Sequence, residues 1–189
     1  MSREVTRCKW PKDDALYIAY HDKEWGVPVY EDLKIFEILL LETFQAGLSW
    51  ITILRRRENF RAAFDNFNYQ KIANYSDEKL EDLRKDTGII RNKLKIKAAK
   101  TNAIAFMKVQ KEFGTFGKYL WGFVGGNPIH NSFEKMNEIP ANTPLSDKIS
   151  NDLKRREFEF VGSTIVYAHM QAMGMVNDHT TNCFRYNEV

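Results

Sequence analysis

Cysteine is nearly absent from this chain of 189 residues, which contains only Cys8 and Cys183. Two cysteines so far apart exclude a disulfide-rich scaffold, which needs several bridges in a short chain. Long apolar runs are also missing, and none approaches the roughly 20 residues of a membrane-spanning helix. The first fourteen residues are charged and lack an apolar core, so no secretory signal is predicted. We therefore expect a cytosolic protein without a membrane partner.

A strong excess of charge of either sign is lacking as well. The chain has 28 Lys and Arg residues against 25 Asp and Glu residues, a net charge of +3. Such a small excess excludes a globally basic nucleic-acid binder, so any surface for nucleic acid must be local. A hydrophobic content of 43% suits a globular core. We expect one domain over residues 1–189, built as two closely packed helical lobes.

Hydrophobic periodicity predicts helices almost throughout, with no βαβ alternation, phosphate loop or internal repeat. Helices are predicted over residues 32–44, 50–57, 58–64, 76–84, 91–112, 119–124, 144–156 and 163–173. The buried side of the longest one is predicted to consist of Leu94, Ile96, Ala99, Ile104, Ala105 and Phe106. Ser76 and Thr143 resemble helix N-caps, and Pro144 suits a first helical position. Residues 125–144 are predicted to form the extended loop of an all-α fold.

Each cysteine has a histidine near it in the sequence. Cys8 precedes His21, and His179 precedes Cys183 in a His-x3-Cys pair. Two thiolates and two imidazoles form a complete tetrahedral ligand set for zinc. Four protein ligands leave no position for water, so such a zinc would be structural and would tie residues 8–21 to residues 179–183. Two unrelated buried cysteines with incidental histidines, or a disulfide, are the alternatives.

Aromatic and polar residues crowd sixteen positions near the N-terminus: Trp10, Tyr17, Tyr20, His21, Glu24 and Trp25. On a helix, the middle four of these residues share one face. Aromatic residues at helical spacing usually belong to a core, and this interpretation stays open beside that of a ligand pocket.

Glu42 is an acid predicted to face inward. It lies four residues after Ile38 and seven after Ile35, on the helix that buries both. A buried ionised carboxylate is costly unless it is paired or hydrogen-bonded. Glu42 is therefore either a partner in a structural salt bridge or a site residue facing a cationic or donor-bearing ligand. An acid among Trp and Tyr rings suits a positively charged planar ligand, through cation–π contact and a counter-charge.

A local basic segment spans residues 84–100, in which seven of seventeen residues are Lys or Arg. It surrounds Gly88, which separates two helical patterns, and includes Arg91 and Lys93. A helix, a glycine-containing turn and a second helix with free amides at its start form a suitable grip for phosphate. A solvated helix face is the alternative.

Several motifs along the chain together resemble a known family. They are Tyr-His-Asp-Lys-Glu-Trp-Gly-Val-Pro at 20–28, Gln-Ala-Gly-Leu-Ser-Trp at 45–50, Gly-Ile-Ile-Arg at 88–91, Phe-Val-Gly at 160–162 and Asn-Asp-His at 177–179. Across residues 7–183 the chain resembles bacterial 3-methyladenine DNA glycosylase I, a family of the helix-hairpin-helix glycosylase superfamily. The resemblance implies a base excision repair enzyme of the bacterial cytosol. It would release 3-methyladenine from alkylated double-stranded DNA and leave an abasic site.

The resemblance also implies roles for individual residues. The family binds a structural zinc ion through two Cys and two His residues, which match Cys8, His21, His179 and Cys183. Its pocket residues match Trp10, Tyr17, Tyr20, Trp25, Glu42 and Trp50. Of the pocket residues, Glu42, Tyr20 and Trp50 are expected to take part in the reaction. One departure is Glu157, where family members often have glycine.

The expected mechanism follows from the charge of the lesion. N3-methylation makes the base cationic and weakens its glycosidic bond, so no strong general acid is needed. We expect the nucleotide to be flipped out of the duplex, with Glu42 accepting hydrogen bonds from the base and Leu48 filling the vacated stack. Water would then attack C1′. Between residues 100 and 128 the only acid is Glu112, consistent with the family's lack of the superfamily's catalytic aspartate.

Two other functional classes remain open from the residues alone. A zinc hydrolase would need an open metal position, which a four-ligand site does not provide. A non-catalytic, zinc-stabilised nucleic-acid-binding protein would explain the basic segment but not the inward Glu42 and its aromatic neighbours. A glycosylase needs no symmetric partner, so a monomer is expected.

Overall fold

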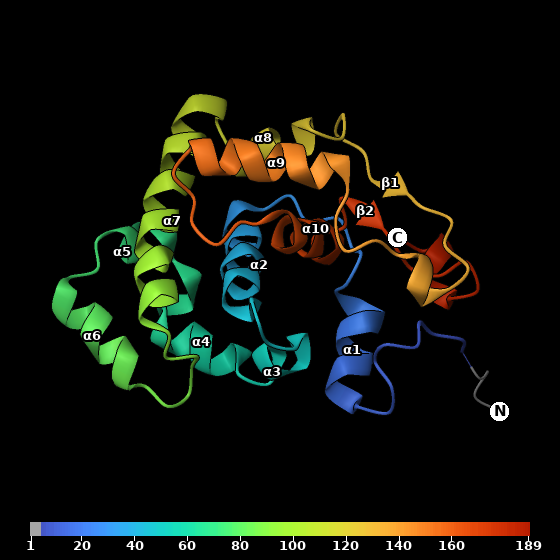
Figure 1. Ribbon diagram of the computed structural model, residues 1–189, viewed down its shortest axis with the longest axis horizontal. Coiled ribbons are helices and arrows are strands. Elements are labelled where there is room, and N and C mark those ends of the chain that lie inside the picture. Colours follow the sequence, from blue (N-terminus) through green and yellow to red (C-terminus); the bar gives the residue numbers. More distant parts are fainter. Residues whose placement is uncertain (1–4) are drawn as a thin grey trace.

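The computed structural model describes residues 5–189, and helices dominate it (Figure 1). The α-helices are α1 (Ala15–Lys23), α2 (Asp32–Gln45), α3 (Trp50–Leu54), α4 (Arg57–Ala63), α5 (Tyr69–Ala73), α6 (Asp77–Lys85), α7 (Lys93–Phe113), α8 (Phe116–Gly122), α9 (Pro144–Arg155) and α10 (Ser163–Ala172). Short 3-10 helices are η1 (Asp65–Phe67), η2 (Met136–Glu138) and η3 (Phe184–Asn187). The predicted all-α class is confirmed. The small exception is a parallel pair of two-residue strands, β1 (Ile129–His130) and β2 (Val176–Asn177).

Side-chain caps set several helix starts. The Ser76 and Thr143 hydroxyls each accept a hydrogen bond, at 3.2 Å, from the amide three residues further on. Pro144 follows Thr143 at the first helical position. Both caps were predicted from the sequence, because the signal for a cap is local. Asn92 caps α7 in the same way, accepting from the Leu94 amide at 3.0 Å.

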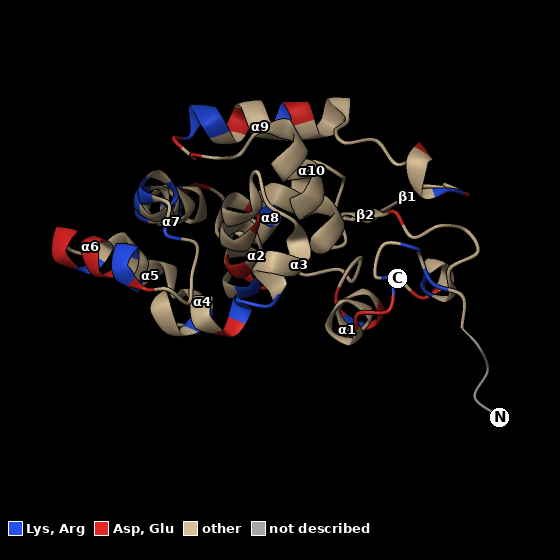
Figure 2. Ribbon diagram, turned by 60° about the horizontal axis from the view of Figure 1, so that its bottom comes forward, with Lys and Arg blue, Asp and Glu red and all other residues tan. Residues whose placement is uncertain are grey.

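The core centres on α2, which is buried along most of its length. Helix α10 contains no Lys, Arg, Asp or Glu and lies beside α2 in the middle of the molecule (Figure 2). Phenylalanine rings connect α2 to α7, and α7 to α8. The ring centroids of Phe106 and Phe116 lie 4.1 Å apart, and those of Phe36 and Phe106 lie 5.1 Å apart.

The prediction for the buried side of α7 is partly wrong. Leu94 is 63% exposed and Ile104 is 40% exposed. The helix instead buries Ile96, Ala99, Ala103, Phe106 and Val109, which recur every three or four residues. Leu94 and Ile104 fall outside this stripe, and the choice among several apolar positions depended on which neighbours packed against the helix.

Two other boundaries differ from the prediction. Helix α3 ends at Leu54, not at residue 57. Helix α8 begins at Phe116, not at residue 119, so Gly117 lies inside it. The Gly117 amide donates to Asp32 Oδ1 at 2.8 Å, so an acid distant in sequence stabilises this helix start.

Glu157 adopts a left-handed backbone conformation, with φ of +70°. It lies in the turn between α9 and α10 and forms an ion pair with Lys108. This conformation suits glycine because a Cβ atom makes it unfavourable. The departure noted in the sequence therefore falls on a strained position.

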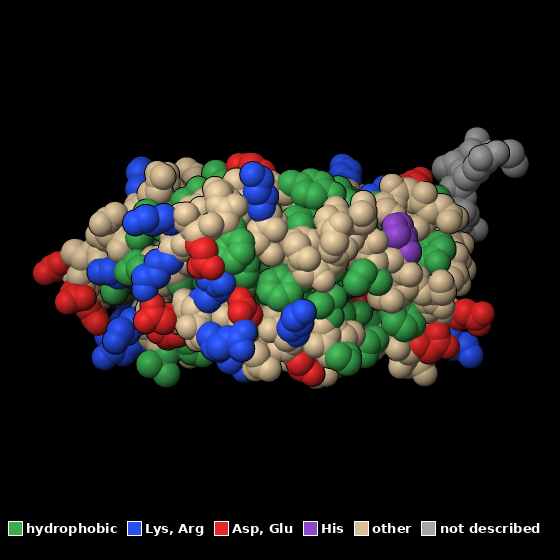
Figure 3. All heavy atoms as spheres, turned by 90° about the horizontal axis from the view of Figure 1, so that it is seen from above, with side chains coloured by type: hydrophobic (Ala, Val, Ile, Leu, Met, Phe, Trp, Pro, Cys, Tyr) green, Lys and Arg blue, Asp and Glu red, His purple; other side chains and the backbone are tan. Residues whose placement is uncertain are grey.

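Two connections that matter below lie at one edge of the molecule, the lower edge in Figure 1. The hairpin loop (residues 86–92) joins α6 to α7, and the Leu48 loop (residues 46–49) joins α2 to α3. The opposite side carries α8 and α9 and is seen in Figure 3, where Lys and Arg side chains gather toward the α5–α7 end. No helix within residues 5–189 is both long and apolar enough to cross a membrane.

Candidate active site and metal cluster

A cavity of about 190 Å³ lies among α1, α2, α3 and α10. It is lined by Trp10, Tyr17, Tyr20, Trp25, Glu42, Gln45, Trp50, Met136, Ile139, Ala168 and Gln171. The structure thus brings together all six residues that the sequence placed in a pocket. Five lining residues were not predicted. Gln45 lies within a motif already noted, whereas Met136, Ile139, Ala168 and Gln171 come from distant segments with no local signal.

The aromatic rings of the cavity meet mostly edge to face. The centroids of Trp10 and Tyr17 lie 4.6 Å apart, and those of Trp10 and Trp25 lie 5.2 Å apart. The Tyr20 and Trp50 rings lie 5.5 Å apart with 46° between their planes. These pairs fix one another's orientation, so the aromatic walls of the cavity hold each other in place.

Among the described residues, Glu42 is the only acid that lines this cavity, and it is 3% exposed. Within residues 5–189, no group hydrogen-bonds to its Oε2 atom and none forms an ion pair with its carboxylate. Burial raises the pKa of this carboxyl to about 8. The alternative of a structural salt bridge is therefore unsupported, and Glu42 is an acid without a partner in the part of the chain that the structure describes.

Other polar atoms in the same cavity are also unsatisfied. Trp10 Nε1, Trp50 Nε1 and Gln45 Oε1 are buried without a hydrogen-bond partner among residues 5–189, as is Glu42 Oε2. Buried polar groups are normally paired, because leaving one unpaired costs on the order of 1–3 kcal/mol. Two donors and two acceptors left open in one aromatic cavity indicate a site for a planar ligand that carries both donors and acceptors.

Glu24, which was predicted to share a helix face with Tyr20, lies outside this cavity. It follows the last residue of α1, and Arg57 donates two hydrogen bonds to its carboxylate, at 2.6 and 2.9 Å. Glu24 therefore joins α1 to α4 through a bidentate ion pair.

The four predicted metal ligands form a buried cluster. One ligand atom from each of Cys8, His21, His179 and Cys183 lies within 4.8 Å of the others. Cys8 Sγ and Cys183 Sγ each lie 3.6 Å from His179 Nδ1, and Cys183 Sγ lies 3.5 Å from His21 Nε2. Tetrahedral zinc with normal bond lengths separates sulfur and nitrogen ligands by about 3.6 Å. The donor atoms fit a metal ion, and both cysteines are free of a disulfide.

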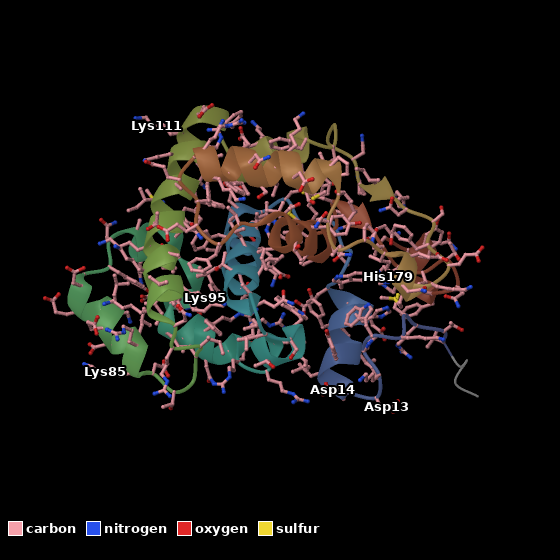
Figure 4. The ribbon with its side chains drawn as sticks, in the orientation of Figure 1. Asp13, Asp14, Lys85, Lys95, Lys111 and His179 are labelled. Atoms are coloured by element: carbon pink, nitrogen blue, oxygen red, sulfur yellow. The ribbon has the colours of Figure 1, made fainter. Side chains whose placement is uncertain are left out.

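Surrounding groups orient the ligands. Asp22 Oδ1 lies 2.7 Å from His21 Nδ1, which leaves Nε2 facing the cluster, and Arg7 in turn binds Asp22. The Cys8 thiol, together with His179 and His21, lowers the pKa of the Cys183 thiol by hydrogen bonding. A metal site needs this combination of fixed imidazole tautomers and an available thiolate. Figure 4 shows His179 beside sulfur atoms, on the right-hand side of the molecule in this view.

The residues predicted to contact DNA lie at the edge of the molecule that carries the hairpin loop and the Leu48 loop. Leu48 is 41% exposed in the Leu48 loop, and Arg91 and Lys93 are exposed where the hairpin loop enters α7. Neither basic residue forms an ion pair with residues 5–189. Gly88 lies in the hairpin loop with its carbonyl turned toward the protein, where Arg56 and Asn59 donate to it at 3.1 and 3.2 Å.

The fold and the site define a class of protein. It is a helical chain in which a helix, a hairpin loop and a second helix lie at one edge, beside a buried aromatic cavity and a cluster of two Cys and two His residues. The family model described as methyladenine glycosylase matches residues 10–186. The chain belongs to this methyladenine glycosylase family.

Individual relatives cover nearly the whole chain. The protein is 47% identical over 182 residues to DNA-3-methyladenine glycosylase 1 of Escherichia coli strain K12, covering 96% of this chain and 97% of the relative. A crystal structure of 3-methyladenine DNA glycosylase I superposes with a TM-score of 0.92 at 48% sequence identity. The match covers 95% of this chain and 98% of the chain in that structure. A variant of such an enzyme in complex with 3-methyladenine has a TM-score of 0.92 at 30% identity, with coverages of 94% and 96%.

Proposed function

We propose that this protein hydrolyses the N-glycosidic bond of 3-methyladenine in alkylated DNA, as a monofunctional repair glycosylase. The observation that carries the proposal is the partnerless acid Glu42, buried in a cavity whose walls are Trp and Tyr rings. A cationic base edge would supply the charge and the donors that this carboxyl lacks. The family and the named activities of its relatives point to the same substrate.

Base recognition would rest on Glu42 and the rings around it. Burial raises the pKa of this carboxyl to about 8, which favours its protonated form at neutral pH. A cationic base favours the ionised form, so the carboxyl would release its proton to solvent as the base enters. Tyr20 and Trp50 would hold the base by stacking, while Trp10, Tyr17 and Trp25 complete the pocket. Normal adenine carries no charge and would gain less from the same contacts.

The chemical step would need little from the protein beyond these contacts. As the bond from C1′ to the base breaks, its electron pair neutralises the cationic base, which leaves as neutral 3-methyladenine. A water oxygen bonds to C1′ and loses a proton to solvent, which gives an abasic site. Glu112, the only acid between residues 100 and 128, forms an ion pair with Arg156 on the surface. It therefore takes no part in this scheme.

Double-stranded alkylated DNA is the proposed partner, bound by a monomer in the bacterial cytosol. The hairpin loop around Gly88 would bind the phosphate backbone, with Arg91 and Lys93 adding charge. Leu48 would enter the duplex and replace the flipped base in the stack. Its exposure at the same edge as the hairpin loop supports this role.

Zinc is the proposed occupant of the Cys8, His21, His179 and Cys183 cluster. The two-thiolate, two-imidazole set and its spacing suit tetrahedral zinc. When bound, the ion would supply structural cross-linking between the two ends of the chain, with no open position for substrate.

Release of free base from alkylated duplex DNA tests the proposal directly. Purified protein should liberate 3-methyladenine, detected by chromatography, and leave abasic sites without cutting the strand. Glu42→Gln protein with an unchanged fold is the matched control and should release the base much more slowly. Absence of base release by wild-type protein that binds the duplex would overturn the proposed activity and leave a binding protein.

A further inference from the structure

Two cationic side chains at the edge that carries the hairpin loop and the Leu48 loop bind backbone carbonyls. Arg56 donates to the carbonyl oxygens of Thr87 and Gly88 in the hairpin loop, at 3.0 and 3.1 Å. Lys95 Nζ donates to the carbonyl oxygens of Phe44 and Ala46, at 2.9 and 2.6 Å. Those two carbonyls lie at the end of α2, where the Leu48 loop begins.

The two contacts cross between the same two loops. Arg56 follows α3, which continues from the Leu48 loop, and it reaches the hairpin loop. Lys95 lies in the first turn of α7, which continues from the hairpin loop, and it reaches the Leu48 loop. Figure 4 shows Lys95 at the lower end of α7, on the side that faces α2. Each loop is therefore held by a cation from the helical segment that follows the other.

Neither cation has an acidic partner among residues 5–189. Lys95 is only 6% exposed, and burial lowers the pKa of its ammonium. A buried ammonium is costly unless its donors are used, and hydrogen bonds from a charged donor to carbonyls are about twice as strong as neutral ones. Because Lys95 is buried, its charge is directed to the backbone of the Leu48 loop and not to a phosphate.

The orientation of the hairpin loop follows from the same contacts. Holding the Gly88 carbonyl toward Arg56 and Asn59 points the next amide, that of Ile89, the opposite way, because a trans peptide places C=O and N–H on opposite sides. Asp86 Oδ1 accepts from the Gly88 amide at 2.7 Å and fixes the preceding peptide. Arg56 therefore sets which hairpin groups face solvent.

We propose that Arg56 and Lys95 are positioning residues that hold the hairpin loop and the Leu48 loop at one fixed spacing. Backbone binding by one loop then places Leu48 in register with the nucleotide to be flipped. The proposal rests on the glycosylase function above. Positioning within about 1 Å can change a rate by up to about 100-fold, so a loose spacing should slow base flipping while the pocket remains intact.

The test compares Lys95→Met with Lys100→Met. Lys100 lies on the same helix, and its Nζ also donates to a backbone carbonyl, that of Tyr75, at 2.6 Å. Tyr75 precedes α6, away from both loops, so Lys100→Met removes the same kind of bond without touching their spacing. Three quantities are measured on full-length protein: single-turnover release of 3-methyladenine from duplex DNA, affinity for undamaged duplex across salt concentrations, and affinity for free 3-methyladenine.

We expect Lys95→Met to slow single-turnover release about 10- to 100-fold. Its affinity for free 3-methyladenine and the salt dependence of its affinity for undamaged duplex should equal those of the wild type. Lys100→Met should release the base at the wild-type rate. A 2-aminopurine opposite the lesion should show weaker unstacking with Lys95→Met. Arg56→Met should lower the affinity for duplex DNA. The double variant should release the base only slightly more slowly than the slower of the two single variants, since both contacts maintain the same spacing between the loops.

Three results would overturn the proposal. One is a wild-type excision rate in Lys95→Met. Another is a salt slope reduced by about 0.9, which would mean that the ammonium contacts a phosphate. The third is an equal loss in Lys100→Met, which would indicate general destabilisation. If Lys95→Met does not fold, Lys95→Gln replaces it with the same criteria. Failure of the proposed function is distinct, because wild-type protein itself would then release no base.

Discussion

His179 Nε2 lies 3.1 Å from the carbonyl oxygen of Trp25, so a residue of the candidate metal cluster contacts the backbone of a residue that lines the aromatic cavity. The two rings also meet edge to face, with centroids 4.6 Å apart. Gly26 makes this approach possible, because a Cβ atom there would lie 3.0 Å from His179 Nε2. The candidate metal cluster and the cavity are therefore in direct contact, so a change in the cluster should alter the cavity.

Removal of the metal should weaken both the fold and the pocket. We expect about one zinc ion per chain by elemental analysis, since the four ligands make one complete site. Chelation should lower the melting temperature and, through Trp25, the affinity for free 3-methyladenine. Cys183→Ser should reproduce both effects without a chelator. Protein with no metal, free thiols and a melting temperature insensitive to chelator would contradict the zinc assignment.

Glu42→Gln should separate recognition from stability. The substitution keeps the volume, removes the charge and exchanges one acceptor for a donor. Excision of 3-methyladenine should fall about 10- to 100-fold, as expected for the loss of a charge-assisted hydrogen bond. The melting temperature should not fall, since Glu42 forms no ion pair among the described residues. Both quantities are measured on one preparation, and a stable, fully active variant would remove Glu42 from the site.

The same substitution should change how stability depends on pH. The pKa of Glu42 rises from 4.5 to about 8 in the folded protein because of burial. Between these values the folded chain holds a proton that the unfolded chain has released, so the free energy of unfolding falls as pH rises, by at most about 1.4 kcal/mol per unit. Glu42→Gln lacks this contribution. Urea unfolding at pH 5, 6.5 and 8 should show the free energy of unfolding of Glu42→Gln increasing, relative to that of the wild type, as pH rises. A difference that does not change with pH would argue against a raised pKa.

Arg91 and Lys93 should contribute to binding of any duplex, damaged or not. Replacing both with Ala should weaken affinity for all sequences and reduce the slope of log affinity against log salt by about 1.8, or 0.9 for each lost phosphate contact. Fluorescence anisotropy at several salt concentrations measures this. Lys154→Ala with Arg155→Ala is the charge-matched control, since both lie exposed on α9 at the opposite side (Figure 1). Equal slopes for the two double variants would leave the hairpin charges as a solvated face.

Glu157→Gly should stabilise the protein. Glycine adopts the left-handed conformation of this position without the Cβ penalty of about 1 kcal/mol. The ion pair with Lys108 is exposed and contributes little. We expect the free energy of unfolding to rise by about 0.5–1 kcal/mol, measured by denaturant unfolding, with excision unchanged. Lys108→Met is the control for the lost ion pair, and a less stable Glu157→Gly protein would mean that the left-handed conformation carries no strain here.

The sequence by itself determined the helix starts at Ser76 and Thr143, because a cap acts within three residues of its own position. It also indicated which residues could hold a metal ion, since Cys8 and Cys183 are its only cysteines and each has a histidine near it in the chain. The inward direction of Glu42 followed from its spacing to Ile35 and Ile38. These features depend on residue type and short-range periodicity, which a single chain displays directly.

Tertiary structure alone decided which groups the individual side chains contact. Whether Glu42 had a salt bridge depended on residues brought near it by other helices, and none of those described provides one. Leu94 is exposed and Lys95 is buried, although hydrophobicity alone predicts the reverse. Lys95 is buried because folding places two carbonyls of α2 within reach of its ammonium, and this long-range hydrogen bonding outweighs the cost of burial. Such choices depend on which elements pack together, and no short stretch of sequence contains that information.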